Sequence, residues 1–143
     1  MKTPVMLAVL SLTALPAAAG DDARTPVPLP PPMAEHMLGN MRDHLVTLNE
    51  ILAALAAGAF DKASDIAEQR LGMSSLAAHG AAHLAPYMPK GMQDTGTAMH
   101  RAASRFARTA QEAAVEHDTA RALGALSEVT SQCVACHSGY RLR

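Results

Sequence analysis

The sequence predicts an all-α protein, folded as an antiparallel, up-down-up-down four-helix bundle. Alanine, the best helix former, is abundant, aromatic residues make up only 3% of the chain, and runs of β-branched residues are absent. Apolar residues recur every three or four positions, as they do on the buried face of a helix. Four such segments joined by short connections make consecutive helices antiparallel neighbours.

The first 19 residues have the pattern of an export signal. Lys2 supplies a positive start, residues 5–15 form an apolar run too short to span a bilayer, and residues 17–19 offer a small-residue cleavage pattern. We therefore expect cleavage after Ala19, a periplasmic location and no transmembrane segment in the mature chain. An ordinary apolar N-terminal helix is the alternative interpretation.

Residues 20–32 are predicted to form a proline-rich linker, followed by a single domain over residues 33–143. The prolines exclude a helix within the linker and favour an extended lead-in, and Pro32 suits the first position of a helix. A domain of this size can bury a substantial core. The whole chain carries 12 basic and 13 acidic residues, which argues against a nucleic-acid partner.

Four helices are expected in the domain, separated by glycine, proline or capping residues. We predict them over residues 33–57, 62–83, 97–117 and 119–139, with a loop over residues 86–96. Gly58 ends the first helix, and Asp61 and Asp118 can cap the second and the fourth. The stripe along the fourth helix has a nearly heptad spacing, which suits a left-handed bundle.

The expected core residues share this helical spacing. They are Met37, Met41, His44 or Leu45, Leu48, Leu52 and Leu55 in the first helix, Ile66, Leu71, Met73 and Leu76 in the second, Phe106 in the third, and Ala122, Leu126, Val129, Cys133, Cys136 and Tyr140 in the fourth. Methionine is an adaptable core residue, so the methionines of the first helix have a structural interpretation as well as a functional one.

The most specific motif is Cys133-Val134-Ala135-Cys136-His137, near the end of the fourth predicted helix. The pattern C-x-x-C-H is the attachment signature of c-type haem. The two thiols can form thioethers with the haem vinyl groups, and the adjacent imidazole can bind the iron. On a helix, positions i, i+3 and i+4 lie on one face. We therefore predict one covalently attached haem c, held by Cys133 and Cys136, with His137 as the proximal iron ligand.

Three other interpretations of the cysteine pair remain open. A thioredoxin-like redox motif normally lies early in a strand–helix unit. A zinc site needs a second pair of ligands, and Cys133 and Cys136 are the only cysteines in the chain. A disulfide between two residues three positions apart on a helix has poor geometry.

With these residues, the sequence resembles class II cytochrome c, the cytochrome c prime family, from about Met33 to Arg141. The closing Cys133-x-x-Cys136-His137-x-x-Tyr140-Arg141 is similar to the family's ending. Met88-Pro89-Lys90-Gly91 is similar to its aromatic-Pro-x-Gly loop, and Phe106 stands where the third helix usually has a phenylalanine. The tryptophan common in that helix is missing, and His100 stands near its place.

The resemblance implies a four-helix bundle with His137 as proximal ligand and the first helix beside the distal face. Some family members leave the iron five-coordinate and bind nitric oxide or carbon monoxide. Others are low-spin, with a methionine of the first helix as sixth ligand. Counting back from Gly58 with the family's helix length makes Met41 the first candidate, Met37 the second and His44 the third.

Further contacts and metal sites can be assigned to single residues. By the resemblance, Arg42 reaches a haem propionate, with a solvated surface charge as its alternative, and Tyr140 covers the haem edge. His79 and His83 lie four apart and could bind a metal, although surface or capping roles are expected for both. We interpret the two histidines of the third predicted helix as structural.

The predicted function is that of an electron carrier, not an enzyme, which passes single electrons between redox partner proteins in the periplasm. Binding of nitric oxide or carbon monoxide at an open sixth site is the alternative. Copper binding is a lesser alternative, suggested by nine methionines and seven histidines. Family members dimerise through their first two helices, and the small residues Ala53, Ala54, Ala56 and Ala57 would permit a homodimer here.

Overall fold

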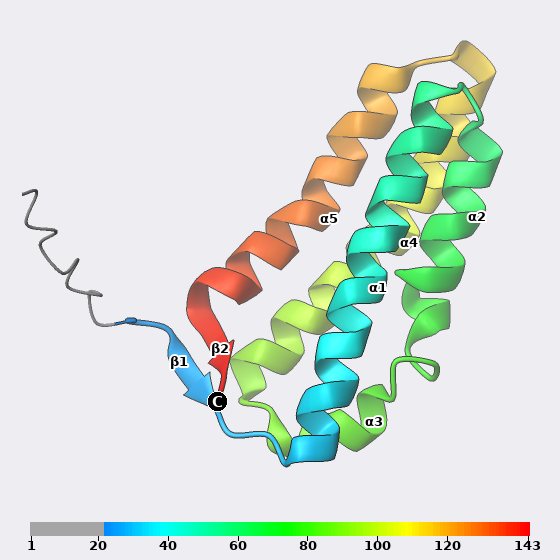
Figure 1. The fold of residues 1–143 in the computed structure, drawn as a ribbon. Coiled ribbons are helices and arrows are strands. Elements are labelled where there is room, and N and C mark those ends of the chain that lie inside the picture. Colours follow the sequence, from blue (N-terminus) through cyan, green and yellow to red (C-terminus); the bar gives the residue numbers. More distant parts are fainter. Residues whose placement is uncertain (1–21) are drawn as a thin grey trace, which may run out of the picture.

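The structure is a computed structural model that describes residues 22–143. It is mostly helical, with a short two-stranded sheet (Figure 1). The helices are α1 (Pro31–Ala56), α2 (Phe60–Arg70), α3 (Ala81–Leu84), α4 (Lys90–Glu116) and α5 (Thr119–Gly139), and the 3₁₀ helices are η1 (Met73–Ser75) and η2 (Ala85–Tyr87). The strands are β1 (Thr25–Val27) and β2 (Tyr140–Leu142). The expected helical character is confirmed, and the predicted export signal lies outside the described residues.

One apolar core joins the longer helices, which lie side by side in Figure 1. α2 packs against α1 and α4, and α5 packs along α4 while touching α1 at few points. The buried stripe of α4 consists mainly of alanines, with Phe106 only 1% exposed, as predicted. Small alanine side chains let the neighbouring helices approach α4 closely.

The ends of α1 follow from its prolines and from one glycine. Pro31 and Pro32 occupy the first positions of the helix. The backbone N–H groups there have no partner within the helix, so proline, which lacks an N–H, costs no helical hydrogen bond. Gly58 adopts φ +70°, which residues with a side chain rarely adopt, and it ends the helix as predicted. The buried face of α1 differs in part from the prediction. Leu45 is 70% exposed, whereas Ile51 is fully buried.

The single second helix predicted over residues 62–83 is wrong, because α2 ends at Arg70. A Cβ on Gly72 would lie 2.7 Å from the backbone oxygen of Glu68, so the chain turns where only glycine fits. Gly80 then adopts φ +62° and starts α3. Asp61 lies in the first turn of α2 but does not cap it.

The start of α4 also differs from the prediction, whereas α5 agrees with it. α4 begins at Lys90 directly after Pro89, so residues predicted as loop form its first two turns. α5 has the predicted bounds, and the Asp118 carboxylate accepts a hydrogen bond of 2.9 Å from the Arg121 backbone N–H.

The proline-rich lead-in is extended, as expected, and it also packs against the domain. β1 pairs in parallel with β2, with Thr25 opposite Tyr140 and Val27 opposite Leu142. Val27 is fully buried and Leu29 is 7% exposed. Figure 1 shows the two strands side by side below the end of α5. The segments that precede α1 and follow α5 therefore cover the same end of the helices.

Candidate functional site

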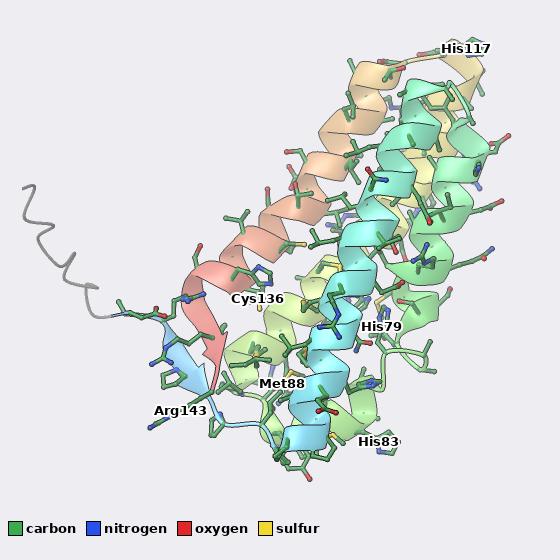
Figure 2. All side chains as sticks on the ribbon, in the orientation of Figure 1. His79, His83, Met88, His117, Cys136 and Arg143 are labelled. Carbon is green, nitrogen blue, oxygen red and sulfur yellow. The ribbon has the colours of Figure 1, made fainter. Side chains whose placement is uncertain are left out.

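The cysteine pair lies in the last turns of α5. Cys133 and Cys136 are free thiols and are half-buried. Cys133 packs against the main core, and Cys136 packs against a second apolar cluster. Figure 2 shows Cys136 close to the point where α5 leads into β2. The side chain of His137 is exposed, so the motif presents two thiols to the protein interior and an imidazole to solvent.

The second apolar cluster, here called the methionine cluster, lies at the end of the molecule where β1 and β2 pair. It draws side chains from both strands and from α1, α3, α4 and α5. Its buried members are Val27, Leu29, Met37, Leu84 and Met92, and its half-buried members are Met33, Ala34, Met41, Met88, Cys136, Tyr140 and Leu142. Methionines of α1, of α4 and of the turn before α4 thus belong to the same apolar cluster as Cys136. Methionine side chains adapt their shape more readily than branched ones.

The first two candidates for a distal ligand both belong to the methionine cluster. Met37 is 8% exposed and Met41 is half-buried, one turn further along α1. His44, the third candidate, lies outside this cluster and packs against two other histidines. The structure therefore brings Met37 and Met41 to the cysteine end of the molecule, whereas the His44 ring packs against His79 and His100.

Burial controls the protonation of the two thiols. It raises the pKa of Cys133, and it also raises the pKa of Cys136, to which the neighbouring Cys133 adds a smaller effect in the same direction. Both side chains are therefore neutral thiols at neutral pH. A thioredoxin-like site depends on the opposite shift, because its attacking cysteine is a thiolate with a lowered pKa.

Tyr140 closes the methionine cluster against the first turn of α4. A Cβ on Gly91 would collide with the Tyr140 hydroxyl oxygen, so the absence of a side chain lets the ring approach. Gly91 ends the segment that begins at Met88, which Figure 2 places at the same end of the molecule. The segment from Met88 to Gly91 and the residues after the cysteine motif, although far apart in sequence, therefore meet in the structure.

Three arginines near this end differ in their surroundings. Arg42 is exposed on α1. The Nε of Arg141 is buried, has no hydrogen-bond partner among residues 22–143, and lies 3.4 Å from the carboxylate of Asp22. The guanidinium of Arg24 donates a hydrogen bond of 3.4 Å to the backbone oxygen of His137. Of the three, Arg24 contacts the cysteine motif directly.

A group of three histidines, His44, His79 and His100, lies between α1, the segment after η1, and α4. The ring centres are 4.8 Å apart for His44 and His79, 5.3 Å for His79 and His100, and 6.2 Å for His44 and His100. His79 is 9% exposed and His100 is 8% exposed. We call these three residues the histidine cluster. They come from distant parts of the sequence, so no spacing rule could have grouped them.

The predicted surface or capping role of His79 is wrong, and the suggested pairing of His79 with His83 does not form. The helix that would have aligned them is interrupted at Gly80. Figure 2 shows His83 pointing away from the helices, while His79 lies next to α1. The backbone oxygen of His79 accepts hydrogen bonds of 2.9 Å from Asn40 Nδ2 and from His36 Nε2, which fasten this segment to α1.

Comparison of the chain with protein-family models, with curated proteins and with solved structures found no match in any of the three. Among residues 22–143, no helix is both long enough and apolar enough to cross a membrane. In the same range, no three His, Cys, Asp or Glu side chains stand in a ready-made arrangement for a metal ion. The chemistry of the site therefore has to be argued from its own residues.

Proposed function

We propose that this protein is a periplasmic monohaem c-type cytochrome that carries single electrons between redox partner proteins. The observation that carries the proposal is the meeting of the C-x-x-C-H motif with the methionine cluster, where Cys136, Met37 and Met41 share one apolar environment. The longer helices would then act as an antiparallel four-helix bundle that encloses a haem near the end of α5.

The donor set fits this cofactor. Two half-buried thiols three residues apart can hold the haem covalently, and the adjacent His137 can bind the iron from one side. The surrounding side chains are apolar and adaptable, which suits a flat hydrophobic ring. When bound, haem c supplies an iron that cycles between its ferric and ferrous states.

On the other side of the cofactor, Met41 is the proposed sixth ligand, with Met37 as the second candidate. A thioether is a soft donor that raises the reduction potential of haem iron. His44 is the least favoured of the three candidates, because its ring packs against His79 rather than within the methionine cluster. The chain's contribution to electron transfer would be to hold His137 and Met41 where each could bind the iron.

Two further residues have proposed roles at the cofactor. Tyr140 would cover the edge of the haem, because its ring belongs to the methionine cluster beside Cys136. Arg42 would reach a propionate, since it is exposed on α1 near Met41. In this interpretation, the exposed side chains around the motif, among them Val134 at 64% exposure, would form the surface that meets a redox partner.

The proposal is tested by producing the protein in a host that exports it and attaches haem to c-type cytochromes. The expected result is a mass increase of one haem per chain that survives denaturation, and its loss in the double variant Cys133→Ser/Cys136→Ser. Mature chains at the bare polypeptide mass would overturn the proposal.

The visible spectrum of the same protein separates the electron carrier from its main alternative. Low-spin bands with a sulfur-to-iron band at long wavelength support a methionine-ligated carrier. A high-spin spectrum that shifts with carbon monoxide would instead indicate a gas-binding protein with an open sixth site. Copper bound in place of haem would support the third hypothesis.

A further inference from the structure

We propose that His44, His79 and His100 form a second site, which binds a divalent first-row transition ion independently of the haem. One histidine comes from α1, one from the segment between η1 and α3, and one from α4. Three elements that are distant in the sequence therefore converge on this point.

The spacing of the three rings matches a shared metal ion. The centre distances of 4.8, 5.3 and 6.2 Å define a triangle whose central point lies about 3.2 Å from each ring centre. An ion at the usual distance of ~2.0–2.1 Å from an imidazole nitrogen lies about 3 Å from the centre of that ring. The three ring centres therefore lie at a spacing that three imidazoles around one ion would have.

The hydrogen bonds of His79 and His100 leave their Nε2 atoms as the metal-binding nitrogens. His100 Nδ1 donates to the backbone oxygen of Leu71 at 2.7 Å. The Ser75 hydroxyl donates to the backbone oxygen of Gly72 at 2.7 Å, so the same hydroxyl accepts from His79 Nδ1 at 3.3 Å. In each ring the proton is therefore on Nδ1 and the lone pair on Nε2. Metal-binding histidines are commonly oriented in this way by an outer hydrogen bond.

His44 supplies the third metal-binding nitrogen, and its ring is the one that can turn. Its Nε2 is buried and has no hydrogen-bond partner among residues 22–143. A buried nitrogen without a partner costs free energy that a ligand would recover. The rings now pack edge to face, and the described residues hold no ready-made site of three ligands. Turning the unbonded His44 ring about its side-chain torsions is the change that binding requires.

The ligands define the class of ion. Three neutral imidazoles suit Zn²⁺, Cu²⁺ and Ni²⁺, whereas Mg²⁺ and Ca²⁺ prefer oxygen ligands. The nearest acidic side chain, Asp43, is exposed and pairs with Arg70 at 2.5 Å, so it is already engaged. The fourth position of a tetrahedral ion would be left to water.

The test uses the mature haem-loaded protein, in which the cysteine thiols are blocked, and Zn²⁺ as the probe. Equilibrium dialysis followed by metal analysis should give one Zn²⁺ per chain. We expect His79→Gln and His100→Gln to weaken Zn²⁺ binding at least tenfold, and Ser75→Ala to weaken it less. The matched controls His83→Gln and His117→Gln remove other histidines and should bind as the unchanged protein does.

A second measurement does not depend on whether the variants fold. X-ray absorption at the zinc edge of the unchanged protein should show about three imidazole nitrogens at ~2.0–2.1 Å. Equal Zn²⁺ binding by the His79 and His100 variants, or an absence of imidazole ligands, would overturn the proposal. The haem spectrum of each variant keeps this test separate from the cytochrome proposal, because loss of Zn²⁺ with an unchanged spectrum concerns only the histidine cluster.

Discussion

Tyr140 and Gly91 occupy adjoining positions, with the tyrosine hydroxyl filling the space that a side chain on Gly91 would take. Tyr140 lies just after the cysteine motif, and Gly91 is the second residue of α4. Their contact joins β2 to α4 and closes one side of the methionine cluster.

The first prediction follows from this contact. Gly91→Ala should destabilise the protein by about 1–3 kcal/mol, because the added methyl group displaces the Tyr140 ring. In a Tyr140→Phe background, which lacks the hydroxyl, the same substitution should be neutral or stabilising, since alanine favours a helix by up to ~1 kcal/mol over glycine. Urea unfolding of the two single variants and the double variant measures the coupling. Additive effects would contradict the contact.

The second prediction concerns the lead-in strand. Val27→Ala should lower the free energy of unfolding by about 2 kcal/mol, because Val27 is fully buried in the methionine cluster. Thr25→Ala, at an exposed position of the same strand, should change it by less than about 0.5 kcal/mol. Denaturant unfolding compares the two variants. Equal, small effects would mean that β1 contributes nothing to stability.

The third prediction distinguishes the two methionines of α1. In the haem-loaded protein, Met41→Leu should remove the sixth ligand and convert a low-spin spectrum to a high-spin one. Met37→Leu should leave the spectrum low-spin and affect stability alone. Met73, an exposed methionine of η1, provides the control as Met73→Leu. The reverse pattern would assign the ligand to Met37.

The fourth prediction concerns pH. Burial, with a smaller contribution from repulsion by His79 and His100, lowers the pKa of His44 to about 4, and burial also lowers the pKa of both neighbours. Nearby Asp43 opposes the shifts of His44 and His79, and His36 adds to the shift of His79. Because the folded protein resists protonation that the unfolded chain accepts near pH 6.5, the stability contribution is complete above pH 6.5 and is lost as the pH falls toward 4.

Unfolding by urea at pH 7.5 and pH 5.5, with a chelator present, measures this dependence. The midpoint should fall at the lower pH, where few carboxylates titrate. His79→Gln should reduce the difference between the two midpoints, whereas His83→Gln, at an exposed site, should preserve it. A midpoint that does not change with pH would contradict the prediction.

The fifth prediction is local to α5. Asp118→Ala should cost about 0.5–2 kcal/mol, because the carboxylate caps the helix through the Arg121 N–H. Asp118→Asn keeps an acceptor oxygen at the same place and should retain most of the stability. Thermal unfolding of the two variants tests whether the cap, rather than the charge, is responsible.

The sequence predicted the parts of the fold that depend on neighbouring residues alone, namely helix caps, helix ends and the buried face of a helix. Asp118 marks the start of α5, Gly58 ends α1, and the period of α4 points Phe106 inward. The second predicted helix failed at Gly72, where a close approach to the Glu68 backbone forces a turn. Composition and periodicity suggested a continued helix there and carried no sign of that approach.

The candidate site likewise has one part that the sequence predicts and one part that only the structure reveals. The cysteine motif is contiguous, so a haem could be proposed from sequence alone, whereas the histidine cluster joins His44, His79 and His100 across separate elements. The helical period left His44 and Leu45 as alternatives for one core position; the structure turns His44 inward and leaves Leu45 70% exposed. A stripe on one helix shows which face is apolar, and the neighbouring elements decide how much of it is covered.

The parallel pairing of β1 with β2 joins positions about 115 residues apart, a long-range contact that forms slowly because the intervening chain must first be organised. Until Val27 pairs with Leu142, one end of the helical domain is not covered by the two strands. The methionine-rich interior would remain accessible from that side during folding.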